Sequence, residues 1–196
     1  MQNEIVKYLS KYIAISENLK KIITESSLVK VYKKRTVLLK QGAYANESYL
    51  VLKGCIRCYY LIDGVEKTTA FYTEECVLTP TSYGKNILSE YYLECTEDTV
   101  AAVGNAITEG DMFGKYPELE SVCRVLSEVF LAKNQESFNS YIISSFEERY
   151  LKLLNDRPDL LQRVPQYQIA SYLGVTPESL SRLRKRLMNK EKQMSA

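Results

Sequence analysis

The stretch VPQYQIASYLGVTPESLSRLRKRLM, which runs from Val164 to Met188, predicts two short helices joined by a tight turn. Pro165 suits the first turn of a helix, where its missing amide hydrogen is not needed. Ile169 and Leu173 lie four residues apart and therefore share one face of that helix. Gly174 predicts the end of the helix, because glycine adopts a positive φ at little cost.

The second helix of this stretch is predicted to begin at Thr176, a favourable N-cap, with Pro177 in its first turn. Three leucines fall on one face of this helix: Leu180, Leu183 and Leu187. Charged and polar side chains fall on the opposite face: Glu178, Arg182, Lys185 and Asn189. One face can therefore pack while the other contacts a partner, which is the layout of a helix-turn-helix with its recognition helix.

Positive charge is concentrated in this part of the chain. From Thr176 onward the sequence holds six basic and two acidic residues, whereas the preceding part holds 20 basic and 22 acidic residues. Such a local excess is typical of a nucleic-acid footprint; the alternative is an ordinary helical hairpin with a solvated basic face. On the nucleic-acid interpretation, the predicted DNA contacts are Gln166, Tyr167, Thr176, Pro177, Glu178, Ser179, Ser181, Arg182, Lys185 and Arg186.

The composition argues against several other classes of protein. The chain has 196 residues, enough for one or two domains, and its hydrophobic content of 45% permits a core. No apolar run approaches membrane-spanning length and the N-terminus lacks a signal-peptide core, so we expect a cytoplasmic protein that does not bind a membrane. The five cysteines do not form a disulfide pattern, and the absence of histidine weakens metal-site and acid–base enzyme hypotheses. We therefore predict that the protein is not an enzyme and that it has no catalytic residue, metal ligand or cofactor.

The spacing of apolar residues changes along the chain. Residues 2–26 predict two short helices, the second capped by Ser16. Short β-type runs follow between residues 28 and 103, with Asp63-Gly64 as a strong hairpin signal. Many short strands at close spacing predict a sandwich or barrel. The predicted fold class is therefore α+β, with an N-terminal antiparallel β-roll of the jelly-roll type.

The pattern becomes helical again near Glu109. After Pro117 the chain has no glycine or proline as far as Ser144, which predicts one long helix. Its uneven apolar stripe exceeds what a small barrel can cover, so we expect it to pair with its own copy in a homodimer; the alternative is a helix packed wholly on its own barrel. The predicted divisions are a β-roll at 1–116, a dimerisation helix at 117–144 and a helix-turn-helix domain at 145–196.

The order of elements and the motifs resemble the Crp/Fnr family of bacterial transcription regulators over nearly the whole chain. LLKQG at Leu38 to Gly42, with YLVLKGCIRCYY after it, is similar to that family's opening strands. IASYLGVTPESLSRLRKRL, from Ile169 to Leu187, is similar to its DNA-reading unit. The resemblance implies a sensory β-roll of the cyclic-nucleotide-binding type, a homodimer, and double-stranded DNA as a partner. RNA polymerase and a small-molecule effector stay open as further partners.

The DNA-reading unit also departs from the family pattern. Glu178 and Arg182 match the family's base-contacting Glu and Arg. Pro177 stands where the best-known members place another base-reading arginine, so the resemblance does not fix the half-site sequence. Few residues follow the recognition helix, and we expect no full β-hairpin wing. An effector-binding or protein-interaction module with a remnant helix-turn-helix that no longer reads DNA is therefore the alternative function.

The effector pocket departs from the family pattern as well. Cyclic-nucleotide binders of this fold have a Gly-Glu pair followed by an Arg-Ser/Thr-Ala stretch, in which the Arg pairs with the phosphate. Here Lys85 is the only basic residue between Lys67 and Lys115, so we expect that cyclic AMP does not bind. The candidate pocket for another effector consists of Tyr83, Lys85, Tyr91 and Tyr92. Core packing is the simpler interpretation of these tyrosines.

Cys55 and Cys58 form a CxxC pattern in a predicted strand. A redox or metal pair is one interpretation, and a thiol-based redox protein is the third functional class. Residues three apart in a strand point to opposite faces, however, and no second CxxC completes a ligand set. Buried structural cysteines are the favoured interpretation.

Overall fold

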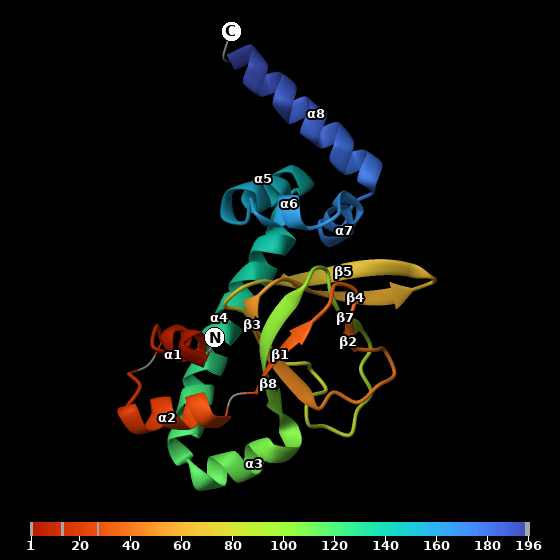
Figure 1. Ribbon diagram of the computed structural model, residues 1–196. Helices are drawn as coiled ribbons and strands as arrows, with labels where there is room; N and C mark the ends of the chain where they lie inside the picture. The colour runs from red at the N-terminus through yellow and green to blue at the C-terminus, as the bar shows by residue number, and fades with distance from the viewer. Residues whose placement is uncertain (1, 13, 27, 195–196) are drawn as a thin grey trace.

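The computed structural model describes residues 2–12, 14–26 and 28–194, which form an antiparallel β-roll and a set of helices (Figure 1). Two helices precede the roll: α1 (Gln2–Leu9) and α2 (Glu17–Ser26). The strands of the roll are β1 (Leu28–Tyr32), β2 (Val37–Leu39), β3 (Glu47–Lys53), β4 (Ile56–Ile62), β5 (Val65–Tyr72), β6 (Val77–Leu78), β7 (Tyr92–Cys95) and β8 (Thr99–Asn105). The helices that follow are α3 (Ala106–Lys115), α4 (Pro117–Ile143), α5 (Phe146–Asp156), α6 (Leu160–Arg163), α7 (Gln166–Tyr172) and α8 (Pro177–Met194). The predicted α+β class with an antiparallel roll is confirmed.

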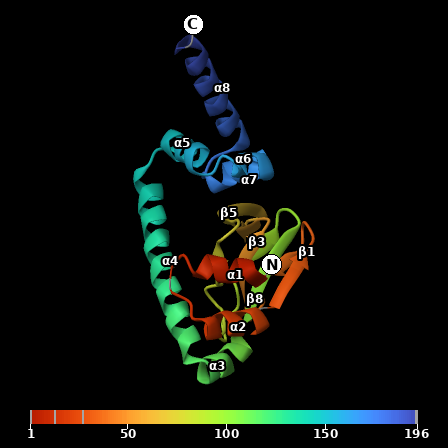
Figure 2. The same cartoon turned by 60° about the vertical axis from the view of Figure 1, so that its left-hand side comes forward.

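The two N-terminal helices form where the apolar spacing predicted them. Ser16 caps α2, since its Oγ accepts a hydrogen bond of 3.1 Å from the amide of Leu19. Ile5 of α1 and Ile23 of α2 are buried in one apolar cluster with Val122 of α4. This cluster also includes strand residues, so α1 and α2 lie between α4 and the roll (Figure 2).

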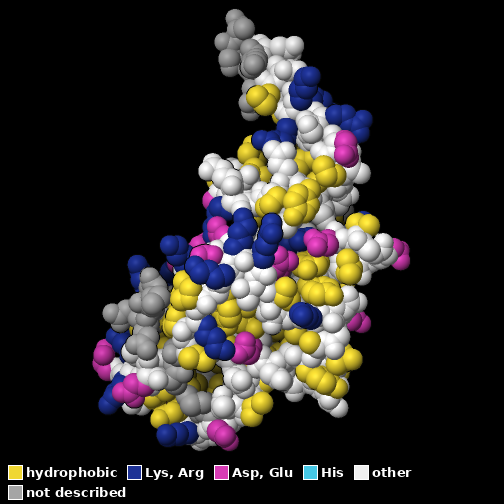
Figure 3. Space-filling model, turned by 45° about the vertical axis from the view of Figure 1, so that its right-hand side comes forward, with side chains coloured by type: hydrophobic (Ala, Val, Ile, Leu, Met, Phe, Trp, Pro, Cys, Tyr) yellow, Lys and Arg dark blue, Asp and Glu magenta, His cyan; other side chains and the backbone are white. Residues whose placement is uncertain are grey.

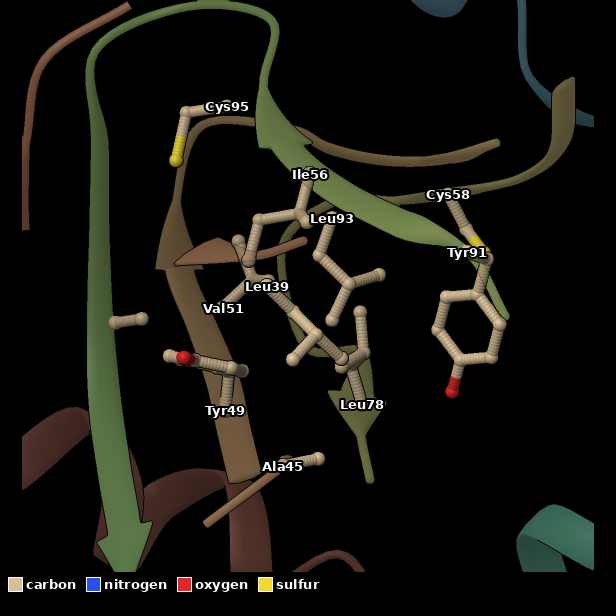
Figure 4. Close-up of a cluster of buried hydrophobic side chains, with 11 residues drawn as sticks. Leu39, Ala45, Tyr49, Val51, Ile56, Cys58, Leu78, Tyr91, Leu93 and Cys95 are labelled. Carbon is tan, nitrogen blue, oxygen red and sulfur yellow. The ribbon is translucent and has the colours of Figure 1, made fainter. Parts of the chain in front are cut away.

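The described residues of the roll form two sheets of four strands each. The strand orders are β1-β8-β3-β6 and β2-β7-β4-β5. Every pairing within these sheets is antiparallel. Asp63 and Gly64 connect β4 to β5 with φ values of 50° and 76°. Positive φ at both turn residues matches the twist of the flanking strands, so the predicted hairpin forms. Val51, Ile56 and Leu93 are buried between the two sheets (Figure 4).

The long helix α4 connects the roll to the C-terminal helices. Helical structure begins at Ala106, directly after β8 and slightly before the predicted change near Glu109. α4 is 27 residues long and runs beside the roll (Figure 2). Ser145 then starts α5 with a capping box, in which its Oγ accepts from the amide of Glu148 at 3.3 Å and its amide donates to the Glu148 carboxylate at 2.7 Å.

The C-terminal helices pack directly on the outer face of the sheet that contains β5. Their shared apolar cluster includes Leu160, Ile169 and Leu173 from the helices and Cys55 and Phe71 from the roll. Ser171 of α7 adds polar contacts, since its Oγ accepts from the amide of Thr68 at 2.9 Å and donates to the carbonyl oxygen of Glu66 at 3.0 Å. The sequence did not predict this contact, which positions α7 relative to the roll.

Candidate nucleic-acid interface

Gly174 ends α7 in a hydrogen-bonded helix stop. Its φ is +74°, and its amide donates to the carbonyl oxygen of Ser171 at 3.0 Å. The amide of Val175 donates to the carbonyl oxygen of Ala170 at 3.0 Å, which completes a Schellman motif. Pro165 lies at the N-cap of α7 rather than within the helix. The first helix and the turn of the predicted helix-turn-helix are therefore present.

α8 begins as the turn chemistry predicted and divides into two faces. Thr176 Oγ1 accepts a hydrogen bond of 3.3 Å from the amide of Ser179, and Pro177 is the first helical residue. Leu180 and Leu183 are 2% and 4% exposed and belong to the apolar cluster of the C-terminal helices. The side chains exposed on the opposite face are Glu178, Arg182, Lys185 and Asn189. α8 extends away from the rest of the molecule, so this face is open to a large partner (Figure 1).

The predicted DNA contacts lie at two places in this unit. Gln166 and Tyr167 are exposed at the start of α7. The others occupy the turn or the first turns of α8, and all of these are exposed except Ser179, which is half-buried. Arg186 differs from the rest because its guanidinium pairs with the carboxylate of Glu147 in α5. Part of its charge is therefore compensated within the protein.

The predicted contacts cover only part of this basic surface. A shallow recess along α8 is lined by Arg182, Lys185, Arg186, Asn189, Lys190 and Gln193. Lys190 and Gln193 were not among the predicted contacts, although the helical period that places Arg182 and Arg186 on one face continues through them. Figure 3 shows lysine and arginine side chains along this projecting helix. The positive surface of α8 is therefore longer than predicted.

Glu178 is an ionised acceptor at the start of α8. Hydrogen bonds from its own amide and from Thr176, together with the nearby charge of Arg182, hold the pKa of this carboxyl below its ordinary value. The positive end of the helix dipole favours the same ionised form. The exposed face therefore presents a carboxylate acceptor one helical turn before a guanidinium donor.

Two of the candidate effector-pocket tyrosines face opposite sides of the roll. Tyr91 is buried in the core between the sheets, and its hydroxyl accepts a hydrogen bond of 2.9 Å from the amide of Thr81. The ring of Tyr92 instead stacks on that of Tyr59, with centroids 5.0 Å apart. Tyr91, which directly precedes β7, and Tyr92, its first residue, therefore face opposite sides and do not line one pocket.

Two cations of the roll, Lys85 and Arg57, are engaged by protein groups. Lys85 is exposed, and its Nζ donates to the carbonyl oxygen of Thr81 at 3.0 Å. Tyr83 is half-buried in the same loop. Arg57 is the only buried charged side chain among the described residues, and it pairs with Glu66 at 2.6 Å. Because Arg57 alternates with the core residues of β4, it lies on the outer face of the sheet and not between the sheets.

Cys55 and Cys58 are free thiols on opposite faces of one sheet. Cys58 belongs to the core of the roll, whereas Cys55 packs against the C-terminal helices. Burial raises the pKa of Cys55 to about 11, so this thiol is protonated at neutral pH. Within the part of the chain that the structure describes, no cluster of three or more potential ligand side chains could hold a metal ion. In the same residues, no helix combines the length and hydropathy needed to cross a bilayer.

Several solved structures share this arrangement. The sequence itself matches no protein-family model and no curated protein. FixK2 from Bradyrhizobium japonicum superposes with a TM-score of 0.66 at 18% identity, over 84% of this chain and 86% of that chain. The global regulator CLP from Xanthomonas campestris gives 0.65 at 16% identity, over 85% and 89%. The catabolite activator protein of Thermus thermophilus gives 0.55 at 17% identity, over 94% and 88%. The chain therefore has the fold of the Crp/Fnr transcription regulators, as the resemblance in its sequence implied.

Proposed function

We propose that this chain is a homodimeric transcription regulator that reads double-stranded DNA with α8. The observation that carries the proposal is the division of α8, which buries Leu180 and Leu183 and exposes Arg182 and Lys185 on a projecting helix. A helix of this kind fits the major groove of B-form DNA. Its cations would neutralise phosphates and release counterions, so the affinity is expected to fall as the salt concentration rises.

α4 supplies the surface proposed for dimerisation. Across Pro117–Ile143, which the structure describes in full, Val122 is the only buried side chain. The large apolar side chains exposed in the second half of α4 are Leu131 (69%), Phe138 (63%), Tyr141 (44%), Ile142 (63%) and Ile143 (83%). Apolar exposure of this extent favours a protein contact. In a two-fold dimer, the two copies of α8 would reach half-sites about 34 Å apart or a multiple of that distance.

The roll is proposed to act as a sensor that does not bind cyclic AMP or cyclic GMP. Lys85 is bound to backbone at the surface and Arg57 to Glu66 on the outer face, so neither of these cations is placed to hold a cyclic phosphate between the sheets. CLP, which has the same fold, is described as responsive to cyclic di-GMP. We infer that the roll binds another small-molecule effector. As parts of the same proposal, the protein is located in the cytoplasm and contacts RNA polymerase.

A gel shift with genomic fragments of the source organism tests the function. We expect retarded complexes at low salt that weaken steeply at higher salt, because phosphate contacts carry most of the affinity. Arg182→Ala should weaken these complexes, whereas Lys21→Ala should not, since Lys21 is an exposed cation on α2, far from α8 in the sequence. The absence of any complex at low salt would support the alternative of an interaction module with a remnant helix-turn-helix.

A further inference from the structure

A cavity of about 210 Å³ lies where the end of α4, the body of α5 and the end of α7 meet. Its charged lining consists of Arg149, Lys152, Asp156 and Arg157. Tyr141 and Leu153 belong to its less polar wall. The cavity is separate from the roll core and from the exposed face of α8, so neither proposed role of those regions accounts for it.

Among the described residues, the two guanidinium groups of this cavity have only neutral partners. Arg149 donates to the carbonyl oxygens of Ser144 at 2.8 Å and Leu173 at 3.2 Å. Arg157 donates to the carbonyl oxygen of Phe71 at 3.1 Å and to the hydroxyl of Thr73 at 3.0 Å. Lys152, the remaining cation of the lining, instead pairs with Asp156, with 3.2 Å between its Nζ and the carboxylate Oδ2.

Two positive charges are therefore left without a counter-charge at half-buried positions. The Nε of Arg149 is also buried, and it has no hydrogen-bond partner among the described residues. An unsatisfied buried donor costs free energy, and a buried charge without a partner costs more. An anion at this position would lower both costs.

We propose that this cavity binds a small organic anion, with its carboxylate or phosphate group held by Arg149 and Arg157. Guanidinium groups present paired donors that match the oxygens of both head groups. The volume is below that of a typical pocket for a drug-sized ligand, which limits the apolar body to about one ring. Leu153 gives that body an apolar surface, whereas the ring of Tyr141 already lies 4.5 Å from the Arg149 guanidinium.

The same site has a direct connection to the helix-turn-helix. Arg149 bonds the carbonyl oxygens of Ser144, directly after α4, and of Leu173, directly before the Gly174 turn. An anion that accepts hydrogen bonds from the Arg149 guanidinium would change the hydrogen bonds through which Arg149 holds α7 relative to α4. The ligand would thereby shift DNA affinity, provided that it binds the two orientations of α7 differently. This regulatory step rests on the proposed DNA-binding function, whereas the binding of the anion does not.

Calorimetric titration of the full chain with benzoate and with phenyl phosphate, at low salt and without DNA, tests the binding. We expect saturable heat with at least one of these anions and none with benzamide, the neutral control. Arg149→Gln should weaken the binding by about tenfold or more, because it removes charge-assisted hydrogen bonds. Arg124→Gln, a matched change at an exposed position earlier on α4, should leave it unchanged.

A second variant keeps the test valid if Arg149→Gln does not fold. Ser137 lines the cavity from the exposed surface of α4, so Ser137→Phe fills the cavity and removes no charge. We expect Ser137→Phe to abolish the heat. No saturable heat with either anion, or equal affinity in native protein and Ser137→Phe, would overturn the site. Anion binding by a chain that retards no DNA would keep the site and overturn only the DNA-binding function.

Discussion

Arg163 at the end of α6 forms a two-pronged contact with Glu74 of the β-roll. Its two terminal nitrogens donate to the two carboxylate oxygens of Glu74, each at 2.9 Å. One of them also donates to the carbonyl oxygen of Gly54 at 2.9 Å, and Nε donates to Glu97 at 2.9 Å. Paired bonds of this type are stronger and more directional than a single bond. One side chain thereby connects the C-terminal helices to separate segments of the roll.

Arg163→Ala should loosen the contact between the C-terminal helices and the roll. We expect the free energy of unfolding to fall by about 1–2 kcal/mol, because several charge-assisted bonds are lost at a partly solvated position. Urea denaturation followed by circular dichroism measures this change. Lys33→Ala is the control, since Lys33 pairs with Asp98 at a position where its side chain is 82% exposed, and such pairs contribute little. Equal losses in the two variants would contradict the prediction.

The contribution of Glu74 should depend on pH. Burial acts to raise the pKa of Glu74, but the hydrogen bonds from Arg163 and from the amide of Gly54 outweigh it, so this pKa lies below its ordinary value. The folded protein then holds the proton less tightly than the unfolded chain does. The stabilisation is therefore complete above the unfolded pKa of about 4.3 and is lost as the pH falls through the lower, folded pKa.

Comparison of native protein with Glu74→Gln at several pH values measures this dependence. The difference in unfolding free energy should be full at about pH 6. It should shrink as the pH falls below the unfolded pKa of about 4.3, where the unfolded chain takes up the proton first, and vanish below the lower, folded pKa. A difference that grows on acidification would show that the ionised form of Glu74 does not stabilise the fold.

Gly174→Ala should destabilise the turn between α7 and α8. Its φ of +74° disfavours a side chain, and a Cβ there would lie 2.8 Å from the hydroxyl of Tyr141. We expect a loss of about 1–2 kcal/mol, measured by thermal or urea unfolding. Gly110→Ala is the matched control, because Gly110 lies within α3, its φ is not positive and a Cβ at this position would meet nothing within 4 Å. That change should be neutral or stabilising by up to about 1 kcal/mol.

Charges on the exposed apolar face of α4 should disrupt the proposed dimer. Phe138→Glu and Ile142→Glu place carboxylates on residues that are both 63% exposed in the single chain, so the fold should tolerate them. In a dimer these positions would be buried, and an unpaired charge there is costly. Sedimentation at micromolar concentration should show a dimer for native protein and a monomer for the variants. Ile107→Glu, at a 75% exposed position on α3, should remain dimeric.

Local chemistry accounts for the parts of this structure that the sequence predicted. Gly174 and Thr176 mark the turn because a positive φ and an N-cap are requirements of single positions. Asp63-Gly64 predicts its hairpin for the same reason. The change from a period of two to a period of 3.6 gives the order of strands and helices without knowledge of how they pack.

The docking of the C-terminal helices on the roll has no such local signal. Arg57 illustrates the difficulty, since alternation in β4 places it on the outer face, where an arginine is ordinarily solvated. It is nevertheless 2% exposed, because neighbouring strands and the docked α7 enclose that face. Its guanidinium lies 4.3 Å from the ring of Tyr59 and pairs with Glu66. Contacts between distant segments of this kind depend on tertiary packing, and a pattern in one segment cannot predict them.

Arg182→Ala should relax base preference as well as weaken binding. A bidentate arginine reads guanine through O6 and N7, so we expect a loss of about 1–3 kcal/mol at the specific site. Glu178→Ala should change which base is preferred, because an ionised carboxylate accepts from the amino group of cytosine. Both effects are measured by selection of binding sites from a random DNA library.

Arg184→Ala is the matched control for this selection. It removes the same charge from the same helix, but at about 100° per residue its exposed side chain points about 160° away from that of Arg182. It should lower affinity slightly and uniformly, since it alters only the general attraction to phosphates. If Arg182→Ala, Arg184→Ala and the native protein selected the same sites, Arg182 would contact the phosphate backbone or nothing, and base reading would have to come from other residues of α7 or α8.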